Sequence, residues 1–138
     1  MNNIEISNYL SSDEYTKRYF QGVVAYDELS LYEKPMGLYV VNTDISTGPG
    51  IHWVCVLIGE NCEYFDSLGK PPSVVKNFLD KQNKPYIFSS KKLQGDKSDV
   101  CGDYCLLYSY FRCRGLSMKD FINIFSNDTV YNDSIVEM

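Results

Sequence analysis

Three side chains that could together form a nucleophilic site stand far apart in this sequence. Cys101 is the only one of the five cysteines expected at the start of a helix, where free backbone N–H groups and the helix dipole stabilise a thiolate. His52 is the only histidine, so imidazole base chemistry could come from no other residue. Asp66 could accept a hydrogen bond from one ring nitrogen and turn the other toward Cys101. This combination predicts acyl transfer by a cysteine nucleophile.

Acyl transfer also needs hydrogen-bond donors aimed at the oxyanion of the tetrahedral intermediate. Gln94 lies seven residues before Cys101, and its amide could join the Cys101 backbone N–H in that role. Gly102 has no side chain and lets another backbone come close. We expect Trp53 and the Gly102 backbone to line a narrow cleft, which would favour glycine in the substrate residues before the cut.

Simpler interpretations of the same residues stay open. Cys101 could be a small buried apolar side chain, His52 a packing residue on a core strand, and Asp66 an ordinary turn residue. Cys101 and Cys105 share a helix face and could collect a metal with His52, but no CxxC pair is present and we expect no metal site. An odd number of cysteines indicates reduced thiols, and we expect the other four to be inert: Cys55, Cys62, Cys105 and Cys113.

The elements that must position these residues are a hairpin and a buried helix. Apolar residues on both faces predict a central strand at 51–58, and a turn at 59–61 returns the chain as a second strand at 62–68. Antiparallel pairing would then bring His52 and Asp66 to the same edge of the sheet. A helix is expected from about Val100 to Arg114, with Ser98 or Asp99 as its N-cap and Gly115 closing it. Apolar residues all round this helix indicate that it is buried.

For the whole chain we expect one domain, spanning residues 1–138, with an α+β, papain-like fold. We expect a sheet packed against the helix that starts at the nucleophile, and a polar tail after the last helix. The further helices are expected near 4–20 with Ser11 or Ser12 as the N-cap, from Pro71 or Pro72 over 73–82, and at 117–125; the further strands are expected at 36–43 and 86–89.

Composition excludes several other classes of protein. The chain has 138 residues, 44% of them hydrophobic, which supplies a core and argues against disorder. Its net charge of -5 argues against a protein that coats duplex nucleic acid. A strip at 76–97 carries six lysines, and it is either a solvated face or a surface for an anionic partner. The longest apolar run, 53–58, has six residues against the roughly 20 of a membrane span, and no secretion signal is recognisable.

Several segments resemble the adenovirus-type cysteine proteases, called adenain, and their relatives in Polinton-type transposons and viruses. They are GIHW (50–53), YFDSLG (64–69) and LQGDKSDVCGDYC (93–105), together with YFQGVVAYDEL (19–29) and NDTVYNDS (127–134). More distantly, the order His-Trp, Asp, Gln, Cys-Gly is similar to the Ulp1-type proteases of SUMO-like modifiers. The resemblance implies a papain-like site in permuted chain order, with Cys101 as nucleophile, His52 as general base, Asp66 orienting His52, and Gln94 in the oxyanion hole. It also implies cleavage after Gly-Gly or Gly-X sites in capsid precursors.

Two departures from the adenoviral pattern bear on partners. Asp66 stands where adenoviral members have Glu, as in the Ulp1 group. The stretch NKPYIFSSKK (83–92) has no Cys, so disulfide attachment of an activating peptide is not expected. No cofactor is required by the sequence, and activation by a peptide or by DNA is left open, with weak support for DNA in this short, acidic chain.

We therefore expect a monomer that acts on a protein substrate, without a membrane, inside a host cell or virion, in the nucleus or cytoplasm, and that is not secreted. Two alternatives remain for the function. The first is removal of a ubiquitin-like modifier after its C-terminal Gly-Gly. The second is a non-catalytic peptide-binding module of the same fold.

Overall fold

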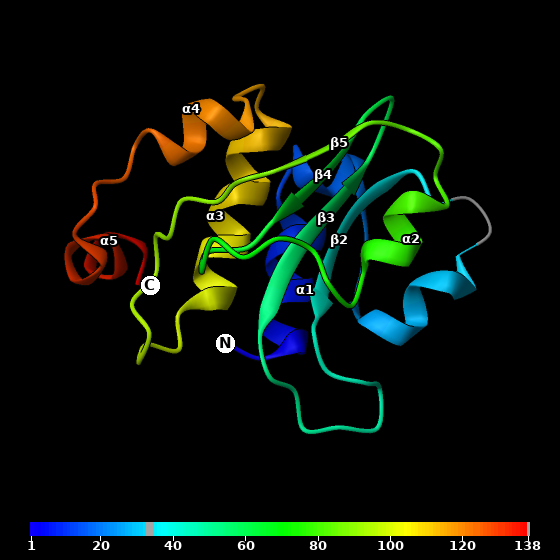
Figure 1. The fold of residues 1–138 in the computed structure, drawn as a ribbon, viewed down its shortest axis with the longest axis horizontal. Helices are drawn as coiled ribbons and strands as arrows, with labels where there is room; N and C mark the ends of the chain where they lie inside the picture. Colours follow the sequence, from blue (N-terminus) through cyan, green and yellow to red (C-terminus); the bar gives the residue numbers. More distant parts are fainter. Residues whose placement is uncertain (33–34, 138) are drawn as a thin grey trace.

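A mixed five-stranded sheet organises the protein, in a computed structural model that describes residues 1–32 and 35–137 (Figure 1). Its order follows the chain, with β2 pairing parallel to β1 and antiparallel to β3, and β4 pairing antiparallel to β3 and parallel to β5. The strands are β1 Phe20–Ala25, β2 Gly37–Asn42, β3 Trp53–Ile58, β4 Cys62–Phe65 and β5 Tyr86–Phe88. The α+β expectation is confirmed.

The hairpin β3–β4 has the expected antiparallel register. Cys55 lies opposite Phe65 and Ile58 opposite Cys62, and the Gly59 N–H donates to the Asn61 carbonyl within the turn. The strands are shorter than the sequence pattern predicts: β3 begins one residue after His52, and β4 ends one residue before Asp66. His52 and Asp66 therefore lie just outside the regular strand pairing, at the same edge of the hairpin.

Helices cover both faces of the sheet. On one face, α1 (Asn3–Ser12) and α3 (Cys101–Cys113) pack on Val40, Cys55 and Phe65. On the other face, η2 (Tyr26–Leu31) and α2 (Lys76–Asp80) pack on a second apolar cluster that includes Val54 and Val56. Because successive side chains of a strand point to opposite faces, β3 serves both cores.

Helix α3 is the buried helix that the sequence predicts. Most of its residues are buried between the sheet and α1, and Gly115 closes it with a φ of +99°, a conformation that residues with a Cβ rarely adopt. The remaining helices are η1 (Thr16–Arg18), α4 (Met118–Ile122) and α5 (Thr129–Val136).

Several expectations are wrong. Strand β1 was not foreseen, because Gly22 and a register irregularity interrupt its pattern. The expected polar tail is the helix α5, which buries Asn132 and Val136 and exposes Val130, Tyr131 and Ile135. Helix α1 is capped by Asn2 with Glu5 in a capping box, and Ser11 and Ser12 lie at its C-terminal end. The helix predicted over 73–82 is confined to α2.

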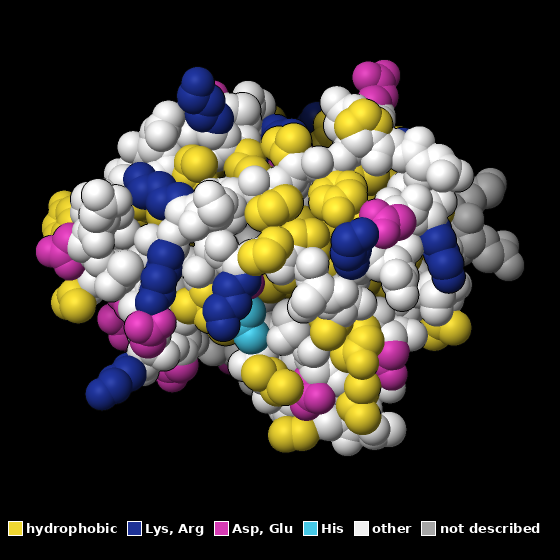
Figure 2. Space-filling model, in the orientation of Figure 1, with side chains coloured by type: hydrophobic (Ala, Val, Ile, Leu, Met, Phe, Trp, Pro, Cys, Tyr) yellow, Lys and Arg dark blue, Asp and Glu magenta, His cyan; other side chains and the backbone are white. Residues whose placement is uncertain are grey.

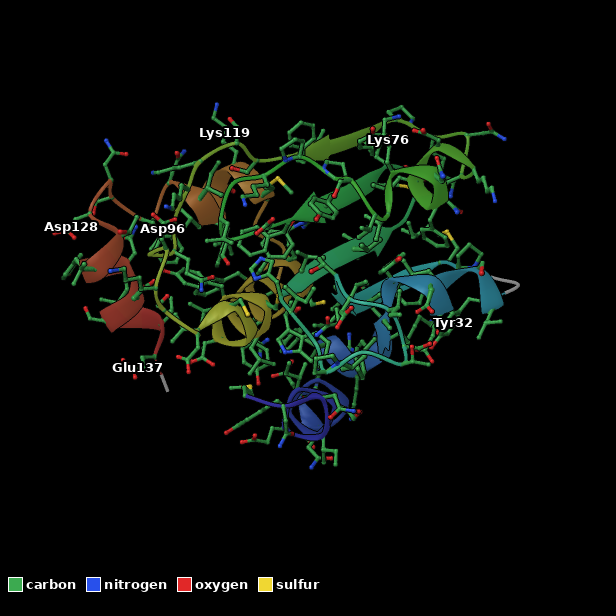
Figure 3. The ribbon with its side chains drawn as sticks, turned by 60° about the horizontal axis from the view of Figure 1, so that its bottom comes forward. Tyr32, Lys76, Asp96, Lys119, Asp128 and Glu137 are labelled. Carbon is green, nitrogen blue, oxygen red and sulfur yellow. The ribbon has the colours of Figure 1, made fainter. Side chains whose placement is uncertain are left out.

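The lysine strip at 76–97 does not form one continuous basic patch. Lys76 pairs with Asp80 and Lys92 with Asp96, and the Lys91 ammonium donates to two backbone carbonyls. Lys76 and Asp96, near the two ends of the strip, lie on opposite sides of the view in Figure 3. In Figure 2, Lys and Arg side chains are separated by apolar and uncharged surface. Within the described residues, no helix is long and apolar enough to cross a membrane.

Candidate active site

Cys101 is the first residue of α3, as predicted, but the helix has a different cap. Val100 occupies the N-cap position, and no side chain of the described residues caps it; the Ser98 hydroxyl bonds the Gly95 carbonyl instead. The prediction of Ser98 or Asp99 as N-cap is therefore wrong. An uncapped helix start leaves backbone N–H groups near the sulfur, which favours negative charge there.

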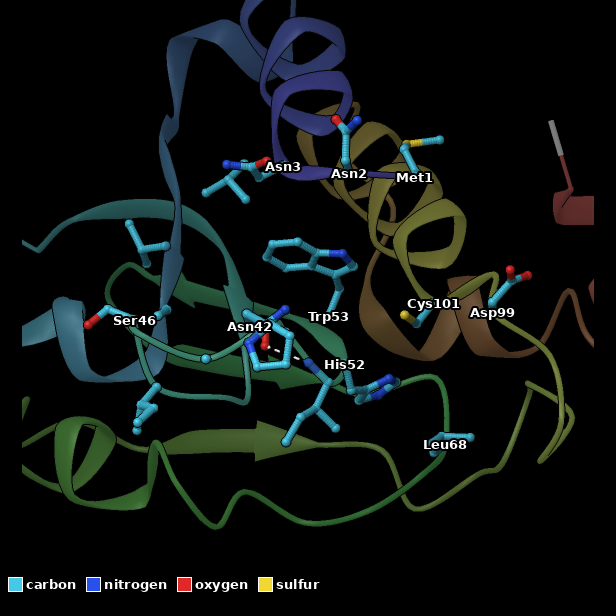
Figure 4. Close-up of a pocket in the computed structure, with 18 of the residues that line it drawn as sticks. Met1, Asn2, Asn3, Asn42, Ser46, His52, Trp53, Leu68, Asp99 and Cys101 are labelled. Carbon is cyan, nitrogen blue, oxygen red and sulfur yellow. Dashed lines mark hydrogen bonds between the residues drawn. The ribbon is translucent and has the colours of Figure 1, made fainter.

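His52 and Asp66 form the contact that the hairpin predicts. The His52 Nε2 atom lies 2.7 Å from Asp66 Oδ1, and the same oxygen accepts the Leu68 N–H at 2.8 Å. Asp66 is only 4% exposed, so its carboxylate has little freedom to turn away. With Nε2 engaged by Asp66, Nδ1 is the ring nitrogen left for Cys101, the second group that raises the pKa of His52. His52 and Cys101 line the same cavity (Figure 4).

The electrostatics of this contact favour a thiolate–imidazolium pair. Burial alone would lower the pKa of His52, but hydrogen bonds with Asp66 and Cys101 and the charges of those groups raise it to about 9. Burial alone would raise the pKa of Cys101, but the hydrogen bond with His52 and the backbone N–H groups of Trp53 and Gly102 lower it overall. Between the two pKa values the sulfur is negative and the ring positive.

The other thiols lack this environment. Burial raises the pKa of Cys62, of Cys105 and of Cys113, the last to about 11. All five cysteines are free, and Cys55, Cys62 and Cys105 are buried. Among the described residues, no cluster of His, Cys, Asp and Glu could hold a metal ion. Cys101 is thus chemically distinct from the other cysteines whose pKa is shifted.

Gln94 lies in the wall of the same cavity and is 3% exposed. Its side-chain oxygen accepts the Ser67 hydroxyl at 2.6 Å, and its side-chain nitrogen donates to the Ser98 carbonyl at 3.0 Å. One amide hydrogen remains outside these two bonds. The structure therefore brings Gln94 to the cavity that also holds Cys101 and His52.

The cavity has a volume of about 790 Å³ and is open to solvent. Trp53 lines it, together with the start of α1 and the loop after β2 (Figure 4). Asn42 fixes that loop, because its Oδ1 atom accepts the N–H groups of Asp44 and Ile51. Gly102 is not among the lining residues: it is buried, and a Cβ there would lie 3.4 Å from Ile6 and 3.5 Å from Trp53.

Two contributors were missed from the sequence. The backbone N–H of Trp53 lowers the pKa of Cys101, and the Ser67 hydroxyl bonds Gln94. A backbone donor leaves no signal in residue type. Ser67 does have a signal, its position directly after Asp66 in the segment YFDSLG, but nothing local connects it with Gln94 across 27 positions.

The fold is α+β, and it matches that of a known cysteine protease. The crystal structure of the African swine fever virus pS273R protease superposes with a TM-score of 0.65 at 20% identity, covering 96% of this chain and 65% of that one. The central domain of Lpg1148 from Legionella pneumophila gives a TM-score of 0.58 at 15% identity, covering all of this chain and 92% of that one. Both likenesses concern the fold.

In sequence, the chain shows distant homology to cysteine protease S273R of African swine fever virus. It is 31% identical over 99 residues to the protein of isolate Tick/Malawi/Lil 20-1/1983, covering 61% of this chain and 36% of that protein. It is 29% identical over 115 residues to that of isolate Tick/South Africa/Pretoriuskop Pr4/1996, named SUMO-1 cysteine protease S273R, covering 71% and 42%. The chain thus spans roughly two fifths of these relatives. No protein-family model matches it.

Proposed function

We propose that this chain is a cysteine endopeptidase with Cys101 as nucleophile, His52 as general base and acid, and Asp66 as the residue that orients His52. The observation that carries the proposal is the 2.7 Å contact of His52 with Asp66, at an open cavity that both His52 and Cys101 line. Distant homology to a cysteine protease supports the same class.

The reaction would proceed through a thioester. The Cys101 thiolate attacks the substrate carbonyl carbon, and the new S–C bond places a negative charge on the carbonyl oxygen. The Gln94 amide and the Cys101 backbone N–H would donate to that oxygen. The C–N bond then breaks as the His52 imidazolium gives its proton to the leaving amine. Water, losing a proton to neutral His52, cleaves the thioester and returns the thiolate.

For the substrate, we propose cleavage after Gly-Gly or Gly-X sites in capsid precursor proteins encoded by the same virus or mobile element. The bulk of Trp53 on the cavity wall supports small residues before the cut. A second candidate is removal of a ubiquitin-like modifier after its C-terminal Gly-Gly. One relative is named SUMO-1 cysteine protease S273R, which favours this second candidate.

The test compares wild type with Cys101→Ala and, as a matched control, Cys113→Ala. Each protein is incubated with a Gly-Gly reporter peptide, a co-encoded capsid precursor and an intact SUMO conjugate, with and without added DNA. We expect wild type and Cys113→Ala to cleave, and Cys101→Ala to be inactive. Gln94→Ala should lose about a hundredfold in kcat. Preference for the conjugate would select the second candidate, and an active Cys101→Ala protein would overturn both.

A further inference from the structure

Ser67 connects the orienting carboxylate with the proposed oxyanion donor. It directly follows Asp66 and is 1% exposed. Its carbonyl accepts the backbone N–H groups of Leu93 and Gln94, at 2.9 and 3.0 Å, and its hydroxyl bonds the Gln94 side chain at 2.6 Å. Three hydrogen bonds therefore join one buried serine to a two-residue stretch far along the chain.

The hydrogen-bond partners fix which way the Gln94 amide faces. A backbone carbonyl can only accept, so the group that Gln94 turns toward the Ser98 carbonyl must be the nitrogen. Its oxygen then faces the Ser67 hydroxyl, which must donate. This leaves the second N–H of the amide for a ligand in the cavity that Gln94 lines. Rotating the amide by a half turn would put oxygen against oxygen at Ser98.

We propose that Ser67 is a positioning residue that keeps an N–H of Gln94, and not its oxygen, directed at the oxyanion. The inference rests on the proposed peptidase function. Without the Ser67 hydroxyl, the buried Gln94 oxygen would lose its donor, and only the bond to the Ser98 carbonyl would hold the amide in place. An amide oxygen facing the oxyanion would repel it. The segment 66–67 would thus set both the base, through Asp66, and the oxyanion donor, through Ser67.

The first measurement is a kinetic double-mutant cycle with Ser67→Ala and Gln94→Ala. We expect Ser67→Ala to lower kcat by about tenfold to a hundredfold with little change in KM, since the interaction is made in the transition state. In the Gln94→Ala background, Ser67→Ala should have less than about a twofold further effect, because it acts through Gln94. Ser109→Ala is the control: it removes another buried hydroxyl, which bonds the Cys105 carbonyl on α3.

Two further measurements separate positioning from structural damage. Affinity for a peptide aldehyde, whose adduct with Cys101 carries an oxyanion, should fall together with kcat in Ser67→Ala. Alkylation of Cys101 by iodoacetamide forms no oxyanion and should keep its wild-type rate. Effects of Ser67→Ala and Gln94→Ala that multiply, or a parallel loss of Cys101 alkylation, would overturn the proposal.

The orientation can also be measured without turnover. In isotope-labelled protein, the side-chain NH₂ signals of Gln94 should be sharp and slow to exchange in wild type and averaged in Ser67→Ala. Unchanged signals would refute the role of Ser67 even if no substrate is cleaved. If wild type cleaves no substrate, the peptidase function is contradicted. If the Gln94 signals still differ between wild type and Ser67→Ala, the orienting role of Ser67 remains supported.

Discussion

Removing the imidazole should make Cys101 behave like an ordinary thiol. In His52→Ala the sulfur loses the hydrogen bond and charge that lower its pKa, while burial continues to raise it. A thiol with the ordinary pKa of 9.0 is ionised in about one molecule in a hundred at pH 7. The wild-type thiolate, with its lower pKa, is less basic and therefore a weaker nucleophile, which offsets part of the difference in alkylation rate. We expect iodoacetamide to alkylate Cys101 more slowly in His52→Ala than in wild type at pH 7, by at most about a hundredfold.

The assay is the pH dependence of Cys101 alkylation, read by mass spectrometry of the Cys101 peptide. Wild type should react at lower pH than His52→Ala, in which Cys101 should react only as the pH approaches or passes 9. Cys113, whose pKa burial raises to about 11, is the internal reference and should react slowly in both proteins. Equal alkylation of Cys101 at pH 7 in wild type and His52→Ala would refute the thiolate–imidazolium pair.

Three further predictions concern the acid, the core and the last helix. Asp66→Asn can keep the contact with His52 but removes the charge that raises its pKa to about 9, so kcat should fall about tenfold and the alkaline limb of the pH–rate profile should move to lower pH. Arg112→Leu leaves the buried carboxylate of Glu63 unpaired, and urea denaturation should show a loss of about 3 kcal/mol in the free energy of unfolding. Asp133→Asn loses an acceptor for the Tyr104 hydroxyl or for a loop N–H, and should lose about 1 to 2 kcal/mol by the same measurement.

The parts of the site that local patterns encode could be predicted. A lone histidine and a turn between two apolar runs placed His52 and Asp66 at one edge of the hairpin, and a glycine that ends a buried helix helped to place Cys101 at the helix start. Helix α3 and the hairpin β3–β4 follow from periodicity, which depends on neighbours within a few residues. The ends of the two hairpin strands were predicted too far out. Polar residues such as His52 and Asp66 occur both inside strands and just beyond them, so residue type alone does not show where a strand ends.

What failed depended on distant partners. Strand β1 is defined by pairing with β2, and α5 by docking Asn132 on the Leu93 carbonyl, so neither has a strong local pattern. Gly102 was expected on the cleft wall, but the packing of α1 and Trp53 buries it.

The sequence by itself determined the inventory of the site: one imidazole, one thiol at a helix start, one carboxylate on the hairpin and one amide before the helix. The tertiary structure decided their relations. It set the 2.7 Å contact of His52 with Asp66 and the orientation of Gln94 between Ser67 and Ser98. A hydrogen bond forms only when the donor–acceptor distance is correct to within a few tenths of an ångström. For residues far apart in the chain, only the packed core fixes distances that closely.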